Sequence, residues 1–336
     1  MQSVLRETTL GLWCEAGGFH LDPVAPVARA VLSHAHADHA HPGSEAYLCA
    51  APSLPLLRRR LGAAARIETL AYGERLRVGG VELSFHPAGH VLGSAQVRID
   101  QGGEVWVFSG DYKREPDPTC APFEPQRCHA FVTEATFALP IFRWEEPQAV
   151  SREIFAWWQA GAREGRASVL FAYALGKAQR ILAELSRLTD RPAFVHGMLE
   201  PYCALYREAG VPLLPTRVLV EEEKGRSFAG ELVLAPLPAR GTPWMRRLGV
   251  RQEAFASGMM RLRGTRRRRS FDRGFALSDH ADWTSILRTV RETSATRVFA
   301  THGHREALSQ YLREQGLDAR PLAAGLGAEP DPLEGD

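Results

Sequence analysis

The sequence predicts a mixed α/β fold in two parts, in which an alternating strand–helix unit interrupts a strand-rich sandwich. Three observations predict it. Residues from about 8 to 140 show short strands separated by turn signals, with one helix near Ala51 to Leu61, which is typical of one sheet of a sandwich. From Glu146 helices and strands alternate, which favours a parallel α/β unit. After about Phe275 polar residues again follow strands, so the alternating unit must be an insertion if these residues join the first part.

The elements of the interrupting unit follow from local pattern. The predicted helices cover residues 151–162, 176–188 and 199–209, and the predicted strands cover 167–173, 193–195 and short segments near Val218 and Leu232. A helix at 283–291 and a strand near Val298 belong to the returning part. The predicted domains are therefore 1–145 with 274–325, and 146–273 inserted between them. The tail 326–336 is rich in Pro, Gly and acidic residues and is expected to be disordered.

Candidate metal ligands concentrate at the end of an apolar run. The pattern H-x-H-x-D-H places His34, His36, Asp38 and His39 within six residues. On an extended segment His34 and His36 point the same way, and the next two residues follow as the chain turns. Imidazole and carboxylate suit Zn, Mn or Fe, so one short segment could serve two adjacent ions. A histidine-rich surface loop without metal is the weaker alternative.

Three more candidate ligands lie where strands are predicted to end. His90, Asp111 and His302 each follow a β-branched or aromatic run and lie beside a glycine. This pattern places a functional group on the rim of a sheet. A single histidine in such a place is usually satisfied or solvated. Together with the first cluster, however, the three residues predict a site for two metal ions.

These motifs resemble a known superfamily. The H-x-H-x-D-H cluster followed by His90 and Asp111 resembles the metallo-β-lactamase superfamily, and Asp22 in F-H-L-D-P matches its upstream aspartate. Glu134 in T-E-A-T and His280 in L-S-D-H-A-D look like motifs A and B of the β-CASP branch, which processes nucleic acids.

The later motifs narrow this resemblance. His302 in T-H-G looks like motif C of the same branch. The segments 87–96, 109–120 and 277–283 are most similar to the bacterial DNA-ligase-associated exonucleases, and the resemblance covers nearly the whole chain.

The resemblance implies a metallo-β-lactamase αββα fold with an inserted β-CASP domain, and two divalent transition metal ions, Zn or Mn. One ion would be held by His34, His36, His90 and Asp111, and the other by Asp38, His39, Asp111 and His302, with Asp111 shared. Asp22 would orient a ligand histidine. Asp38, Glu134 and His280 would be catalytic, with His280 as the general acid and Glu134 as the carboxylate that keeps it charged.

The expected activity is hydrolysis of phosphodiester bonds in DNA, as an exonuclease in repair that is functionally associated with a DNA ligase and a helicase. A β-CASP ribonuclease is the main alternative, because the histidine at position 302 favours RNA while the whole-chain similarity favours DNA. A small-molecule metallo-hydrolase would not need a basic insertion or a second catalytic histidine. A binding subunit without activity is disfavoured because every predicted ligand is present.

Two features of the insertion are candidate contacts to the polymer. Lys177 follows a predicted strand and begins a helix, where backbone N–H groups and the helix dipole attract anions. An ordinary strand-to-helix turn with an exposed lysine explains the same residues about equally well. Seven arginines lie within residues 261–273, and the candidate contacts among them are Arg261, Arg263, Arg266, Arg267, Arg268 and Arg269. A phosphate backbone is their natural partner, and we expect them near the metals because His280 follows closely.

Composition agrees with an intracellular enzyme. The net charge of the 336 residues is only +2, so global charge does not indicate nucleic acid, although only three of the 41 basic residues are lysine. We see no signal peptide and no apolar run long enough to cross a membrane. Five scattered cysteines are expected to be free thiols in a reducing cytoplasm.

The arginine run generates a first testable prediction. Neutralising Arg266 to Arg269 should weaken DNA binding equally for all sequences, because phosphate contacts position the polymer without reading bases. Each lost contact should flatten the slope of log affinity against log salt by about 0.7 to 0.9. Binding titrations across a salt series measure both quantities. Unchanged affinity and slope would mean that the run is only a solvated loop.

Overall fold

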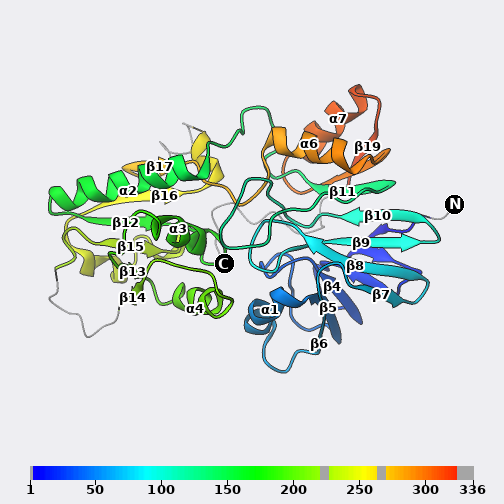
Figure 1. Ribbon diagram of the computed structural model, residues 1–336, viewed down its shortest axis with the longest axis horizontal. Coiled ribbons are helices and arrows are strands. Elements are labelled where there is room, and N and C mark those ends of the chain that lie inside the picture. The colour runs from blue at the N-terminus through cyan, green and yellow to red at the C-terminus, as the bar shows by residue number, and fades with distance from the viewer. Residues whose placement is uncertain (1–2, 220–226, 263–269, 324–336) are drawn as a thin grey trace. The chain divides into compact units, whose positions relative to one another are not determined.

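The computed structural model describes residues 3–219, 227–262 and 270–323 (Figure 1). Within them the chain forms two compact units. The first contains the chain up to Pro116, Cys120–Arg143 and the chain from His280 onward, and the second contains Asp117–Thr119 and Trp144–Asp279. The mixed α/β class is confirmed. The predicted disordered tail, 326–336, lies outside the described residues. None of the described helices is long and apolar enough to pass through a lipid bilayer.

Two mixed sheets build the first unit. In spatial order, the first sheet contains β1 (Arg6–Thr8), β2 (Gly11–Cys14), β3 (Phe19–Leu21), β4 (Arg29–Leu32), β5 (Ala46–Ala50) and β6 (Ile67–Leu70). The second contains β19 (Asp318–Pro321), β18 (Arg297–Thr301), β11 (Ala130–Glu134), β10 (Glu104–Phe108), β9 (Ala95–Gln101), β8 (Val81–Pro87) and β7 (Arg75–Val78). Each sheet is antiparallel in one part and parallel in the other, with β3 to β6 and β10, β11, β18 and β19 parallel.

The two sheets pack face to face, and helices cover the outer face of the second. Alternate residues of β10 show this arrangement. Trp106 and Phe108 share a core with Val31 of the first sheet. Val105 and Val107 belong to a second core with α6 (Trp283–Thr293) and α7 (Arg305–Glu314). This period of two is what a strand buried on both faces requires. The remaining helix, α1 (Leu54–Leu61), connects β5 and β6.

The second unit is one parallel sheet of six strands. Its spatial order is β14 (Thr216–Val218), β13 (Ala193–Val195), β15 (Leu232–Ala235), β12 (Ala167–Phe171), β16 (Arg251–Ala256) and β17 (Arg273–Phe275). One face packs against α2 (Pro147–Arg163), α3 (Lys177–Leu185) and α4 (Glu200–Glu208). The other face is covered by short 3-10 turns that contribute Met245 and Met260. The predicted alternation and parallel sheet are confirmed, and the helices end within a few residues of the predicted ends.

Strand ends bring the chemically active residues of the first unit together. β4 ends directly before Ser33, and β10 ends three residues before Asp111. The parallel strands β10, β11 and β18 deliver Asp111, Glu134 and His302 to the same edge of their sheet. Gly110 makes the turn into Asp111 with a φ of 54°, and a Cβ there would lie 2.5 Å from the Cβ of Ser33. Only glycine fits such a close approach without strain.

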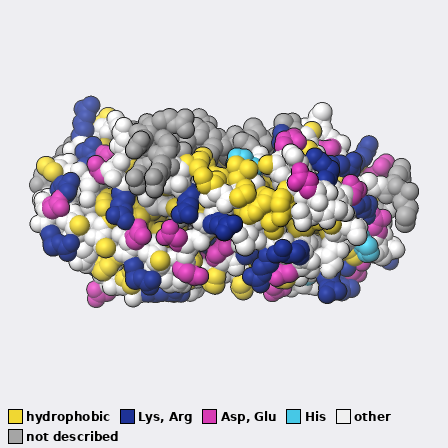
Figure 2. Space-filling model, turned by 90° about the horizontal axis from the view of Figure 1, so that it is seen from above, with side chains coloured by type: hydrophobic (Ala, Val, Ile, Leu, Met, Phe, Trp, Pro, Cys, Tyr) yellow, Lys and Arg dark blue, Asp and Glu magenta, His cyan; other side chains and the backbone are white. Residues whose placement is uncertain are grey.

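Charged side chains are mixed over the visible surface. On the face seen in Figure 2, Lys and Arg side chains are interspersed with Asp and Glu side chains. The five cysteines are free, as expected.

Candidate metal and catalytic site

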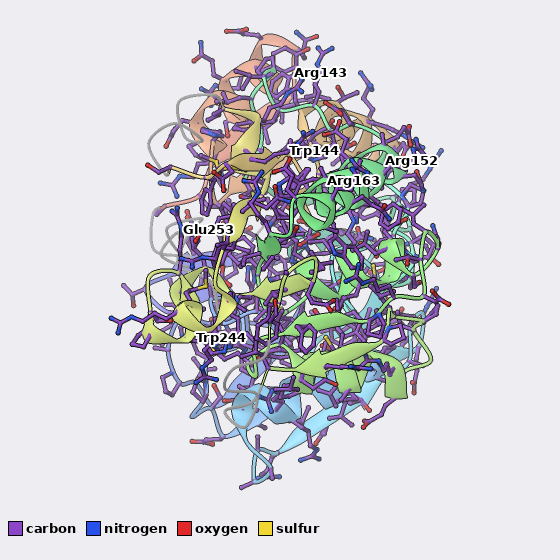
Figure 3. The ribbon with its side chains drawn as sticks, turned by 90° about the vertical axis from the view of Figure 1, so that its left-hand side faces the viewer. Arg143, Trp144, Arg152, Arg163, Trp244 and Glu253 are labelled. Atoms are coloured by element: carbon purple, nitrogen blue, oxygen red, sulfur yellow. The ribbon has the colours of Figure 1, made fainter. Side chains whose placement is uncertain are left out.

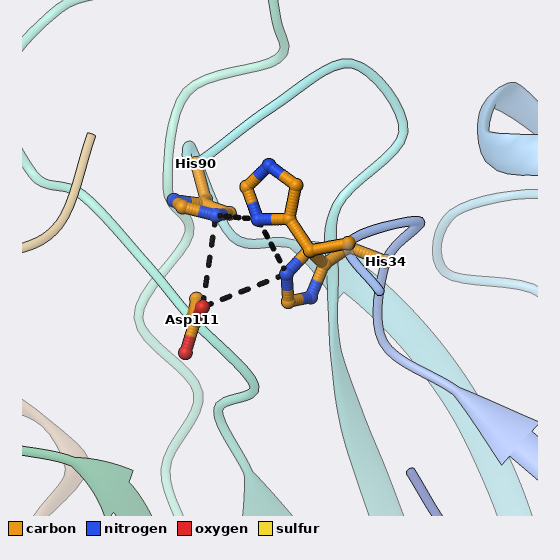
Figure 4. A group of neighbouring side chains, drawn as sticks. His34, His90 and Asp111 are labelled. Atoms are coloured by element: carbon orange, nitrogen blue, oxygen red, sulfur yellow. Dashed lines mark hydrogen bonds and ion pairs between the residues drawn. The ribbon is translucent and has the colours of Figure 1, made fainter. Parts of the chain in front are cut away.

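Four predicted ligands meet at one point in the first unit. His34 Nε2 lies 3.1 Å from His36 Nδ1, which lies 3.0 Å from His90 Nε2 (Figure 4). Asp111 Oδ2 closes the group at 3.5 Å from His34 Nε2 and 3.7 Å from His90 Nε2. Three of the four residues are buried, and His36 is partly exposed. The set is the one expected for the first ion, although its role as a ligand set stays a prediction.

A second group, made of Asp38, His39 and His302, adjoins the first through the contact of His39 with Asp111. His39 Nε2 lies 3.4 Å from Asp111 Oδ2 and 3.5 Å from Asp38 Oδ2. His302 completes a possible metal-binding set with Asp38 and His39. A cavity of about 20 Å³ is lined by Asp22, Asp38, His39 and His302 together with apolar neighbours, which is space for about one water.

Two of the residues that line this cavity adopt unusual backbone conformations. His302 has a φ of 58° and Asp22 a φ of 37°, values that side-chain-bearing residues rarely adopt. After His302 the chain passes so close to Ala135 and Thr136 that a Cβ on Gly303 would lie 2.4 Å from the Cα of Thr136. Such strain persists only where the surrounding structure enforces it, and it is common at functional sites.

Buried hydrogen bonds orient the ligand histidines. Asp22 accepts hydrogen bonds from the Ser33 amide (2.7 Å), the Ser33 hydroxyl and His39 Nδ1 (2.7 Å). Since the Ser33 hydroxyl donates to Asp22, its oxygen accepts from His34 Nδ1 at 2.9 Å. Both imidazoles thus direct Nε2 toward the centre, which is the orientation that metal coordination requires. Asp22 therefore lies where it can orient His39, as the sequence analysis predicted.

The charges around the site favour a cation. Burial and the charge on His39 lower the pKa of His34 well below its usual range, and burial lowers the pKa of His302, so both are neutral ligands. Burial opposes protonation of His39, but the carboxylates of Asp111 and Asp38 raise its pKa well above the usual range. Burial opposes ionisation of Asp111, yet His39 and His280 hold its pKa well below the usual range. A positive charge is therefore stabilised at the centre.

The residues present fit two divalent transition metals. Among the described residues, the buried His39 Nε2 makes no hydrogen bond but faces Asp111 Oδ2 at 3.4 Å and Asp38 Oδ2 at 3.5 Å, so a cation bound there would lie among one nitrogen and two carboxylates. Ring nitrogens of His34 and His90 lie 3.1 and 3.0 Å from His36 Nδ1, so the three imidazoles converge as ligands of one cation would. Imidazole nitrogen with a few carboxylate oxygens is the donor set of Zn and Mn sites.

The two other predicted catalytic residues also meet. His280 Nδ1 lies 3.0 and 3.1 Å from the two carboxylate oxygens of Glu134 and 3.9 Å from Asp111 Oδ2. Glu134 is fully buried, and its Oε1 also accepts a hydrogen bond from the Tyr112 amide at 2.8 Å. Asp111, Glu134 and His280 could themselves form a third ligand set, so their roles stay predictions.

The structure corrects the expectation for Lys177. The residue begins α3, as the sequence indicated, but it is only 4% exposed, and its Nζ forms an ion pair with Asp279 at 2.7 Å. Arg180 reaches the other oxygen of Asp279 at 3.2 Å. Lys177 is buried and Asp279 already compensates its charge. We therefore do not propose Lys177 as a contact to the polymer.

Most of the arginine run cannot be compared with the structure. Arg263 and Arg266 to Arg269 lie outside the described residues. Arg261 is exposed and lies 3.4 Å from Glu145 in an exposed pair, and such pairs contribute little and leave the guanidinium accessible.

Elsewhere in the second unit, some arginines form ion pairs and others are exposed. Glu253 contacts both Arg240 and Arg251, at 2.9 and 2.8 Å, and although burial raises its pKa, the hydrogen bonds from these arginines outweigh burial and lower it. Arg152 and Arg163 of α2 are exposed (Figure 3).

Sequence reasoning missed two residues that shape the site. Ser33 links Asp22 to His34 through its hydroxyl, and its position directly before the H-x-H pattern was the available signal. Tyr112 acts through its backbone, which any residue could supply, so its side chain gave no signal.

Several known proteins are similar to this chain in sequence. No family model matches the chain. A protein of Opitutus terrae named "Probable DNA ligase" is 30% identical over 312 residues, which cover 92% of this chain and 30% of that protein. The "Endoribonuclease YSH1" of Yarrowia lipolytica is 32% identical over 43% of this chain and 17% of its own length. The "Cleavage and polyadenylation specificity factor 73" of Drosophila melanogaster is 28% identical over 39% of this chain and 19% of its own length. This chain therefore spans less than a third of the length of these relatives.

A solved structure shares the fold. A protein of unknown function from Enterococcus faecalis V583 superimposes with a TM-score of 0.58 over 89% of this chain and 80% of that chain, at 10% sequence identity. At this identity the similarity concerns the fold alone.

The hydrogen bonds of Asp22 generate a second prediction. Asp22→Asn should lower metal affinity by about 10- to 100-fold, because the amide no longer holds the His39 Nδ1 proton as a carboxylate does. Asparagine tolerates the positive φ at this position, so the backbone should be kept. Competition with a chelator measures the affinity. Asp100→Asn, which alters an acid paired with Arg98 away from both ligand groups, is the control. Equal affinities in all three proteins would refute the role of Asp22.

Proposed function

We propose that this chain is a metal-dependent phosphodiesterase, a β-CASP nuclease of the metallo-β-lactamase fold that acts on DNA. One observation carries the proposal. Two His/Asp groups meet where His39 of one contacts the buried Asp111 of the other, and a His280–Glu134 pair adjoins Asp111. This combination supplies two metal positions and a proton donor, which are the requirements of phosphodiester hydrolysis.

The metals would be held by residues on the page. His34, His36, His90 and Asp111 would hold one ion, and Asp38, His39, Asp111 and His302 the other. When bound by these residues, two divalent ions would supply a nucleophilic water near neutral pH and positive charge beside the phosphoryl oxygens.

Side chains of the protein would then protonate the leaving oxygen. Glu134 accepts a hydrogen bond from His280 Nδ1, which would fix the ring and favour its charged form. His280 Nε2 is left to donate a proton to the oxygen that departs from phosphorus. Tyr112, through its backbone amide, keeps the Glu134 carboxylate in place.

DNA is the favoured substrate. The relative that covers 92% of this chain is named a probable DNA ligase, and the remainder of that longer protein is not matched here. An exonuclease that prepares ends in concert with a DNA ligase is consistent with this arrangement, and an association with a helicase stays a prediction. RNA is the alternative, because the partial relatives are named endoribonucleases.

One assay tests the proposed activity and separates these substrates. End-labelled single- and double-stranded DNA and RNA with defined ends are incubated with the protein across a Zn and Mn series. We expect stepwise shortening of DNA that requires metal. Preferential cleavage of RNA would select the alternative, and no cleavage of either polymer would refute the proposal.

The general acid generates a third prediction. His280→Ala should cut turnover by about 10²- to 10⁴-fold, the usual loss of acid–base assistance, while metal content is unchanged. His41→Ala, which removes an imidazole outside the ligand groups, is the control and should retain turnover. Elemental analysis accompanies the kinetics. If His280→Ala loses metal in proportion to activity, His280 is a ligand and its role as an acid is wrong.

A further inference from the structure

The segment that follows Asp111 is hydrogen-bonded to Glu134 and to Ala281, the residue after His280. The Tyr112 amide donates to Glu134 Oε1 at 2.8 Å, and the Tyr112 carbonyl accepts from the amide of Ala281 at 2.7 Å. Tyr112, which directly follows Asp111, therefore links the backbone of Asp111 to the residue after His280. Both hydrogen bonds are made by buried residues, and the loop that contains Tyr112 is held by further contacts.

Arg114 supplies that support from two residues further along. Its guanidinium donates to Thr289 Oγ1 at 2.8 Å and pairs with Glu292 Oε2 at 2.7 Å, and it lies 4.7 Å from the centroid of the Phe123 ring. The side chain is only 7% exposed. Glu115 adds one more contact, since its Oε1 accepts from the Ser285 hydroxyl at 2.8 Å.

All three partners lie on one side of α6. Ser285, Thr289 and Glu292 are spaced by four and three residues, the spacing of a single helix face. Residues 114 and 115 therefore hold α6 along about two turns. The planar guanidinium contacts two of these partners at once, which a lysine ammonium does less well.

The same helix carries His280 at its entrance. α6 begins at Trp283, and its N-cap Asp282 accepts a hydrogen bond from the Ser285 amide at 2.8 Å. His280 precedes this cap by two residues. A shift of α6 against the loop would thus move His280 relative to Asp111, and a misplacement of about 1 Å is enough to cost about 10²-fold in rate.

We propose that Arg114 is a positioning residue, which fixes His280 relative to Asp111 by fastening residues 112–115 to the Ser285–Thr289–Glu292 face of α6. The inference rests on the proposed function in so far as it concerns turnover. Glu292 is suited to its part, because the hydrogen bonds from Arg288 and Arg114 outweigh burial and keep its pKa below the usual value, so it stays ionised.

Arg288 offers a matched control. It also contacts Glu292, at 2.7 Å, but it does so from within α6 at a spacing of four residues and is largely exposed. Arg288→Met removes the same kind of charge from the same carboxylate without releasing the loop. Any effect of Arg114→Met that is absent in Arg288→Met is therefore due to the fastening and not to the charge of Glu292.

Steady-state kinetics of the Zn- or Mn-loaded protein test the proposal. Arg114→Met should lower kcat by about 10- to 100-fold with KM and metal content unchanged. Arg114→Lys should recover part of the loss, and Arg288→Met should resemble the unaltered protein. Thr289→Val removes one contact and should show a smaller loss in the same direction, which serves if Arg114→Met does not fold. Unchanged kcat in both Arg114→Met and Thr289→Val, or a loss matched by loss of metal, would overturn the proposal.

Hydrogen exchange of the metal-free chain provides a readout that does not depend on activity. Peptides covering 112–116 and 280–285 should exchange faster in Arg114→Met and not in Arg288→Met. Unchanged exchange in these peptides would overturn the positioning role whatever the substrate. Absence of turnover in the unaltered protein, by contrast, would overturn the proposed function alone.

Discussion

A buried carboxylate with four histidines around it is the constraint on which this structure depends. Asp111 Oδ2 lies within 3.9 Å of nitrogens of His34, His39, His90 and His280. Burying a carboxylate is unfavourable unless positive charge or hydrogen bonds compensate it. The histidines around Asp111 therefore require protons or metal ions between them. The rest of the first unit is built to keep these groups at this distance from one another.

The scaffold achieves this through strand ends and tight turns. Three parallel strands place Asp111, Glu134 and His302 at one edge, and β4 places the H-x-H-x-D-H segment beside them. Glycines at 110 and 303 allow backbone approaches that a side chain would block. The positive φ of His302 shows that the surrounding fold holds this residue in a backbone conformation that is otherwise unfavourable. Precise placement thus comes from sheet geometry rather than from the ligand segments themselves.

Sequence alone predicted the candidate ligands because they follow rules of local pattern, and the structure brings the ligand atoms of His34, His36, His90 and Asp111 within 4.8 Å of one another. The alternation of His34 and His36, and glycines beside His90 and Asp111, indicated strand ends that carry functional groups. The order of helices and strands in the second unit was likewise readable, since parallel α/β units have a strong period. The partner of Lys177 was not readable, because Asp279 lies 102 residues away in the chain and only the tertiary fold pairs them. Tyr112 acts through its backbone and Arg114 through contacts with a distant helix, so neither could be assigned from neighbouring residues.

The central claim is that Asp111 is shared by two metal ions, and metal stoichiometry tests it most directly. Protein loaded with Zn or Mn and freed of excess metal is examined by elemental analysis, alongside Asp111→Asn. The account predicts two ions per chain and weakened binding of both in the variant, because one carboxylate serves both positions. No bound metal, or a variant that keeps one ion at full affinity, would contradict it.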